Sequence, residues 1–239
     1  YFKESSKLQR QIDFLFDHGS VYLRRNGNLL FHACVLLDED GSLREVEFEN
    51  QKFKGRSFFD YVERRARDAF IYRRQKDLDF MYFLWCGRIS PIAGREFRTF
   101  ERTFIRDEFA WNETSDPYFN LIDRVEIAEM ILREFELDPD RGHIINGHVP
   151  VRVRIGESPI KANGKALLID GGFSTPYHEK TGISGYTLIY NSRGMKLLQH
   201  QKIANVRSAL KENGDIESVS EISPTCTEFI KIFLSSAIL

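Results

Sequence analysis

The stretch HIINGHVPVRVRIGESPIKANGKALLIDGG, residues 143–172, contains two short apolar runs that each end in a polar loop. The runs from His143 to Asn146 and from Ala166 to Ile169 have the length and composition of buried strands. The loop Gly147 to Pro150 follows the first run, and Asp170-Gly171-Gly172 follows the second. A glycine before His148 allows a sharp turn, and a proline after it stiffens the loop. The stretch therefore predicts a constrained imidazole at the edge of a sheet.

A second imidazole has a similar context near the start of the chain. His32 ends the apolar run Leu29-Leu30-Phe31, and the small residues Ala33 and Cys34 follow it. Small neighbours would let the end of a strand approach a ligand closely. Imidazole nitrogen is a common metal donor, so His32 and His148 are candidate metal ligands. A surface or hydrogen-bonded role is the more common one for any single histidine, and these residues alone leave both roles open.

Residue periodicity predicts helices and strands on both sides of these loops. The expected helices are one carrying Leu8, Ile12, Leu15 and Phe16 that ends at Gly19, one from a capping box at Ser57 and Asp60 to about Arg74, a mostly buried one at 77–86, one from Asp116-Pro117 through Phe135, and one at 204–213. The expected strands are 21–23 and 29–37 around an Asn26-Gly27 turn, 46–48, and a hairpin of 186–190 with 195–200. Runs of helix that interrupt runs of strand predict an α/β (α+β) fold.

Composition sets further bounds on the class of protein. The 34 basic and 35 acidic residues nearly cancel, which argues against wholesale attraction to nucleic acid or to an anionic membrane. The 20 phenylalanines predict a core rich in aromatic rings. Cys34, Cys86 and Cys226 form neither a metal-type spacing nor a disulfide framework, which favours a reducing cytoplasm. The apolar residues 229–239 are too few to span a bilayer.

Several motifs together resemble one family, the class III bacterial fructose-1,6-bisphosphatases. The resemblance extends over about residues 5–203 and includes a near-continuous block from Asn146 to His200. A histidine at a strand end, then Gly-His-x-Pro, then a strand into Ile-Asp-Gly-Gly is also the second half of the wider calcineurin-like phosphoesterase pattern. The motifs are FLFDHG at 14–19, NGNLLFH at 26–32, LWCG at 84–87, TFER at 99–102, GESPIKANGK at 156–165, IDGGFS at 169–174 and TGISGY at 181–186.

The resemblance implies a fold and an activity. The fold would be the C-terminal part of a four-layer α-β-β-α metallophosphoesterase sandwich with a mainly helical insertion. The activity would be the hydrolysis of the 1-phosphate of fructose 1,6-bisphosphate to fructose 6-phosphate in gluconeogenesis, by two-metal activation of water. The two divalent cations are typically manganese in this family. In the superfamily pattern, the histidines that match His32 and His148 ligate the same metal.

The same resemblance suggests where a phosphorylated substrate would lie. Asp170, Gly171 and Gly172 would shape the pocket loop beside the metals. A basic rim suits a sugar that carries two phosphates, because arginine and lysine are the usual partners of phosphate. For any single basic residue, solvated surface charge remains the more common role. The candidates for substrate binding are Arg88, Arg95, Arg102, Arg152 and Lys161.

The first-half motifs of the superfamily are Asp-x-His, Gly-Asp-x-x-Asp-Arg and Gly-Asn-His-Glu, and the chain contains none of them. The chain also begins at Tyr1 without an initiator methionine, so we expect upstream residues that supply the other metal ligands, the bridging aspartate and the general acid. By itself this chain should not hydrolyse phosphate esters. Two alternatives remain open: a non-catalytic regulatory or binding module of the same fold, and a phosphatase of another phosphorylated sugar or of a nucleotide.

On this basis the chain divides into four segments. Residues 1–50 would hold second-half phosphoesterase strands and the preceding helix, 51–137 the helical, basic insertion, 138–203 the phosphoesterase sheet with its two loops, and 204–239 a C-terminal helix and tail. The expected partners are fructose 1,6-bisphosphate, the N-terminal half of the same enzyme and further copies in a homo-oligomer, without nucleic acid or membrane. The expected location is the cytoplasm.

Overall fold

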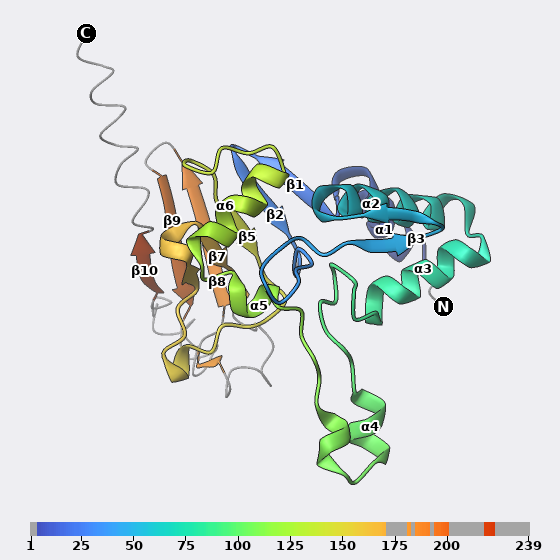
Figure 1. Cartoon of the computed structure of the whole chain (residues 1–239). Helices are drawn as coiled ribbons and strands as arrows, with labels where there is room; N and C mark the ends of the chain where they lie inside the picture. Colours follow the sequence, from blue (N-terminus) through green and yellow to red (C-terminus); the bar gives the residue numbers. More distant parts are fainter. Residues whose placement is uncertain (1–3, 171–180, 183–184, 192–193, 201–217, 223–239) are drawn as a thin grey trace, which may run out of the picture. The chain divides into compact units, whose positions relative to one another are not determined.

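A computed structural model describes residues 4–170, 181–182, 185–191, 194–200 and 218–222 (Figure 1). The chain divides into two compact units, residues 1–121 with 133–137 and residues 122–132 with 138–239. Both helices and strands occur, which confirms the predicted mixed α/β class. Within the residues described, no helix combines the length and the apolar character that crossing a membrane requires. The helix expected at 204–213 lies outside the described residues.

The first unit contains two short hairpins and most of the helices. Its elements are α1 (Ser6–His18), β1 (Tyr22–Arg25), β2 (Asn28–Phe31), β3 (Val46–Phe48), β4 (Gln51–Phe53), α2 (Gly55–Tyr72), α3 (Gln75–Cys86), α4 (Thr99–Phe104), the 3₁₀ helix η1 (Glu108–Trp111) and α5 (Tyr118–Leu121). Strands β1 and β2 pair in antiparallel fashion, with Tyr22 opposite Phe31. Asn26 and Gly27 both have positive φ, 52° and 77°, as a two-residue hairpin turn requires.

Aromatic side chains fill the core of the first unit, as the phenylalanine content predicts. Phe59 and Phe135 are both buried, and their rings meet edge to face at 5.4 Å between centroids. The ring of Tyr22 lies against both of them, at 5.8 and 5.1 Å. Phe31 contacts Phe59 and also Tyr118, each at 5.9 Å. This aromatic cluster joins the β1–β2 hairpin to α2 and thereby fixes β2, the strand that directly precedes His32.

The second unit is built around β7 and a separate antiparallel sheet. Its elements are most of α6 (Val125–Glu134), β5 (Ile144–Asn146), η2 (Val153–Ile155), β6 (Ile160–Lys161), η3 (Ala162–Gly164), β7 (Ala166–Leu168), β8 (Gly185–Asn191), β9 (Gly194–His200) and β10 (Ser218–Ile222). Strand β7 pairs in parallel with β5 and antiparallel with β6. Strands β8, β9 and β10 form an antiparallel sheet in the order β10-β9-β8, which confirms the predicted hairpin.

Two sequence-based boundaries and one prediction of burial were wrong. Helix α2 begins at Gly55, and Ser57 is its third residue: the Ser57 hydroxyl donates to the carbonyl oxygen of Lys54 and accepts from the Lys54 amide. Asp60 therefore lies inside the helix and makes no capping box with Ser57. The strand expected at 29–37 ends at Phe31, because the chain turns at His32. Helix α3 is not mostly buried, since Tyr82 and Trp85 are 65% and 72% exposed.

The helix expected from Asp116 to Phe135 is two helices, α5 and α6, with residues 122–124 between them. A long-range contact lies at the interruption: the Asp123 carboxylate accepts a hydrogen bond from the amide of Ala162, at 3.1 Å, across 39 residues. The apolar periodicity continues through the break because Ile122, Ile127 and Ile131 are all buried. Periodicity alone therefore did not reveal the interruption.

Candidate functional site

The loops after β5 and β7 lie side by side in the second unit. Because these two strands are parallel, their carboxyl ends lie at the same edge. The pairing continues past the strands: the amide of Ile169 donates to the carbonyl of Asn146, and the amide of Val151 donates to the carbonyl of Asp170, both at 2.9 Å. The loop that carries His148 is therefore bonded to the start of the loop that carries Asp170. Gly171 and Gly172 lie outside the described residues.

His148 has an unusual backbone conformation. Its φ is +70°, and the amide of Val149 donates to the carbonyl of Gly147 at 2.9 Å, so His148 is the central residue of a tight γ-turn. A positive φ is unfavourable for a residue with a β-carbon, and such conformations concentrate at functional sites. The sequence placed the sharp turn at Gly147, whereas the structure places the positive φ on the imidazole-bearing residue itself.

His32 follows directly after β2 in the first unit. Its side chain is exposed, whereas Phe31 before it and residues 33–37 after it are buried. The backbone on both sides is thus embedded while the imidazole points outward. His32 and His148 belong to different units. Their convergence on one metal therefore stays a prediction.

Both imidazoles have the chemistry of metal donors, and each is presented at a strand end on constrained backbone. The two imidazoles could therefore form part of the ligand set of a metal site. Within the described parts of the chain, no group of three or more histidine, cysteine, aspartate or glutamate side chains is placed to hold a metal ion. The described residues thus fit the role of two ligands but do not complete a site.

Asp116 lies beneath the His32 loop and was not identified from the sequence. Its carboxylate is fully buried, and one oxygen accepts hydrogen bonds from the amides of Leu37, at 3.1 Å, and Tyr118, at 2.9 Å. The other oxygen lies 3.5 Å from the Arg44 guanidinium. Burial raises the pKa of Asp116, and the two amides and Arg44 oppose that rise. In the sequence, the Asp116-Pro117 pair indicates only the start of a helix. Nothing in the residues around it indicates the contact with Leu37.

Arg152 and Lys161 are brought together by one glutamate. The Glu157 carboxylate lies 3.5 Å from the Arg152 guanidinium and 3.5 Å from the Lys161 ammonium, and it accepts a hydrogen bond from the Arg152 amide at 2.9 Å. Burial opposes the charged form of Glu157, but the Arg152 amide and the two cations outweigh it, so the pKa of Glu157 is lowered. Gly156, with φ +82°, makes the turn that folds Glu157 back. The three side chains together carry one net positive charge.

Arg88 and Arg95 lie between α3 and α4, and Arg102 lies in α4, all in the first unit. Helix α4 stands apart from helices α1–α3 (Figure 1). Each of the three arginines is paired with a nearby glutamate: Arg88 with Glu96 at 3.6 Å, and Arg95 and Arg102 with Glu113 at 4.0 and 3.4 Å. The predicted basic rim is therefore partly neutralised by neighbouring acids. All three arginines keep more than a third of their side-chain surface exposed.

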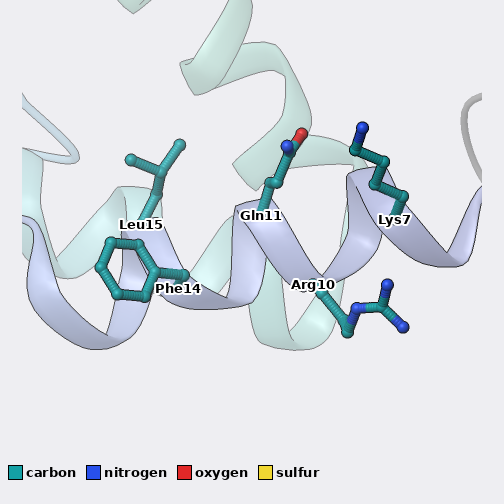
Figure 2. A pocket seen from close by; sticks show the side chains of 5 residues that line it. All are labelled: Lys7, Arg10, Gln11, Phe14 and Leu15. Atoms are coloured by element: carbon teal, nitrogen blue, oxygen red, sulfur yellow. The ribbon is translucent and has the colours of Figure 1, made fainter.

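Two surface depressions lie on the helices of the first unit. Figure 2 shows the outer face of α1, where Lys7, Arg10, Gln11, Phe14 and Leu15 line one of them. The second, of about 480 Å³, lies between α1, α2 and α3 and is mainly apolar. Neither contains any of the candidate site residues.

Comparison with known proteins places the chain in a family of phosphatases. The chain belongs to the family described as Firmicute fructose-1,6-bisphosphatase, which it matches over residues 1–233. The resemblance to the class III enzymes is thereby confirmed.

Two clostridial relatives show the extent of the similarity. The chain is 46% identical over 227 residues to a fructose-1,6-bisphosphatase class 3 of Clostridium botulinum strain Langeland, and 47% identical over 227 residues to one of Clostridium acetobutylicum. Each match covers 92% of this chain but 34% of the relative. The chain thus spans about a third of the length of the curated relatives it matches. No solved structure matches it.

Proposed function

We propose that this chain is the part of a class III fructose-1,6-bisphosphatase that contributes two imidazole ligands and the substrate-facing basic residues. In the complete protein, the reaction would be hydrolysis of the 1-phosphate of fructose 1,6-bisphosphate, serving gluconeogenesis. The family match over residues 1–233 supports the activity, and the names of the clostridial relatives support the substrate. The fold would be the C-terminal part of a four-layer metallophosphoesterase sandwich.

The observation that carries the proposal is the conformation of His148. Its γ-turn fixes the imidazole at the carboxyl edge of the β5–β7 pair, next to the loop that starts with Asp170. A strained turn costs stability and needs a reason. Restricting the imidazole before a metal arrives is such a reason, because ligands perform best when their backbone already holds them in place.

The family implies a divalent metal, and we propose manganese. When bound, such cations would activate a water molecule and neutralise charge on the phosphate. This chain would supply two of the metal ligands, the imidazoles of His32 and His148. The remaining ligands, the bridging aspartate and the general acid would come from the N-terminal half of the enzyme.

Phosphate would be held by the basic candidates. Arg152 and Lys161 share Glu157, so their side chains are already gathered before a phosphate arrives. Arg88, Arg95 and Arg102 stand along the α4 segment in pairs with Glu96 and Glu113, each with its guanidinium partly exposed. We propose that a substrate phosphate replaces these glutamates as the partner of the arginines, because Arg binds phosphate and carboxylate in the same bidentate way.

For the four segments of the chain we propose three roles. Residues 1–50 and 138–203 would belong to the phosphoesterase sandwich, 51–137 would be the basic insertion, and 204–239 a C-terminal extension. The complete protein would act in the cytoplasm as a homo-oligomer, without nucleic acid or membrane as a partner. The N-terminal half of the enzyme would be the principal partner of this chain.

The test is His148→Ala in the complete protein. We expect manganese-dependent release of phosphate from fructose 1,6-bisphosphate to fall by orders of magnitude, because one metal would lose a donor. His18→Ala, which removes an exposed imidazole at the end of α1, is the matched control and should leave turnover unchanged. Near-normal turnover of the His148 variant would refute the assignment. Metal-dependent turnover by this chain alone would refute the expectation that it needs upstream residues.

A further inference from the structure

The segment that follows His32 is hydrogen-bonded to both ends of residues 91–116, the part of the insertion that contains α4. On one side, the amide of Cys34 donates to the carbonyl of Pro91 at 3.2 Å. On the other, the amide of Leu37 donates to the Asp116 carboxylate at 3.1 Å. The sequence separation between Leu37 and Asp116 is 79 residues, so this bond joins the loop to the C-terminal end of the 91–116 segment.

The two ends of the 91–116 segment are also joined to each other. The amide of Asp116 donates to the carbonyl of Gly94 at 2.8 Å, and Arg95 pairs with Ser115 as an isolated β-bridge. Asp116 thus takes part in both contacts, through its side chain to the His32 loop and through its backbone to Gly94. Its position is common to the loop and to the segment that carries the candidate arginines.

Arg44 completes the arrangement from the other side of the loop. Its guanidinium lies 3.5 Å from the Asp116 carboxylate and donates to the Asp38 carboxylate at 2.9 Å, and its amide donates to the carbonyl of Leu36 at 3.1 Å. A buried carboxylate with two amide donors and one cation is stable in one geometry, since any displacement leaves charge unpaired in a low-dielectric environment. The network therefore fixes the backbone from Leu36 to Asp38.

His32 gains its placement from this backbone. The residue itself is exposed, whereas the five residues after it are buried. A metal donor must be held to within about 0.5 Å for tight binding. The buried backbone that follows His32 contributes to that precision.

We propose that Asp116 is a positioning residue. It fixes the His32 loop and residues 91–116 relative to each other, and it thereby strengthens metal binding. The inference rests on the proposed function, because it takes His32 as a metal donor. Asp116 would not touch metal or substrate; it would act through the Leu37 amide and Arg44.

The experiment compares Asp116→Ala with Asp77→Ala in the complete enzyme. Asp77 is the matched control: it is a second fully buried aspartate of the first unit, paired with Arg65 at 3.0 Å and Arg74 at 2.6 Å, and none of these contacts involves the His32 loop. The measurements are the dissociation constant of Mn²⁺ by electron paramagnetic resonance titration, and amide hydrogen exchange at Leu37. Positioning residues around metal ligands typically change affinity by about 10- to 100-fold.

We expect Asp116→Ala to weaken Mn²⁺ binding about tenfold or more and to speed exchange at Leu37. Asp77→Ala should lower thermal stability and leave the Mn²⁺ constant unchanged. Asp116→Asn keeps an oxygen acceptor for the Leu37 and Tyr118 amides and should restore most of the affinity. A loss of folded protein alone would reduce the number of sites without changing the constant, so a changed constant separates positioning from general stability.

If Asp116→Ala does not fold, Arg44→Met replaces it, with a smaller rise in the constant expected. An unchanged constant in the variant that folds, while the wild type binds Mn²⁺ and is active, would overturn the inference and leave the proposed function standing. A wild-type enzyme without metal-dependent phosphate release would overturn both.

Discussion

His143 links the stability of the second unit to pH. This residue directly precedes β5, is 5% exposed, and lies near Lys165, whose carbonyl accepts the amide of Ile144 at 2.8 Å. Burial, and then the positive charge of Lys165, lower the pKa of His143 to about 4 from the ordinary value of 6.5. The imidazole is therefore neutral in the folded protein at pH values where it is protonated in the unfolded chain.

The sign and size of the effect follow from this difference. Between pH 6.5 and about 4 the unfolded chain binds one proton more than the folded protein, so stability falls as the pH falls through this window. This contribution of His143 to stability is fully present above pH 6.5, and its loss levels off below the pKa of about 4 in the folded protein. The gap of about 2.5 units corresponds to roughly 3 kcal/mol in total. At pH 5 the expected loss relative to pH 8 is about 2 kcal/mol.

The assay is urea unfolding of the chain at pH 8 and at pH 5. Amide hydrogen exchange at Ile144 and Leu167 is the readout, because these residues report on strands β5 and β7 directly. With a urea dependence of about 2 kcal/mol per molar, the midpoint should move by about 1 M more in the wild type than in His143→Gln, which cannot titrate. His18→Gln removes an exposed imidazole from α1 and should behave like the wild type. Equal pH dependence in the wild type and His143→Gln would refute the reasoning.

Two further predictions concern the packing behind His32. The Tyr118 hydroxyl is buried and has no hydrogen-bond partner among the described residues, so Tyr118→Phe should raise the free energy of unfolding by about 1 kcal/mol; a lower melting temperature would contradict this. Gly94 has φ +61°, and a β-carbon there would lie 2.7 Å from the Cys34 sulfur, whereas Gly27, with φ +77°, has open space around it. Gly94→Ala should therefore lower the free energy of unfolding in urea by about 3 kcal/mol, and Gly27→Ala by about 1 kcal/mol. Similar losses for both variants would show that the close approach to Cys34 does not destabilise the Gly94 variant.

The family and most of the local elements could be predicted from the sequence. The Asn26-Gly27 pair predicts a hairpin turn because few residues other than asparagine and glycine tolerate positive φ, and the structure has that turn. The apolar runs before Asn146 and after Lys165 predict buried strands, and both are present as a parallel pair. These signals are local: each depends on a few consecutive residues and on the period of one element.

The arrangement around the candidate site was decided by tertiary contacts. Asp116 looked like a helix start, and only the fold brings its carboxylate to the amide of Leu37, 79 residues away. Arg152 and Lys161 are candidate phosphate-binding residues by sequence, and only the structure shows that the turn at Gly156 places Glu157 between them. No periodicity encodes such contacts, because they depend on how separate elements pack.

The sequence by itself thus determined which residues can form strands, turns and imidazole-bearing loops, and which family they resemble. Only the tertiary structure decided that the positive φ near the site falls on His148 and that a buried carboxylate supports the loop of His32. The physical reason is the range of the forces involved. Backbone preferences act between neighbours in the chain, whereas desolvation and charge pairing act between whichever groups the fold brings within a few ångströms.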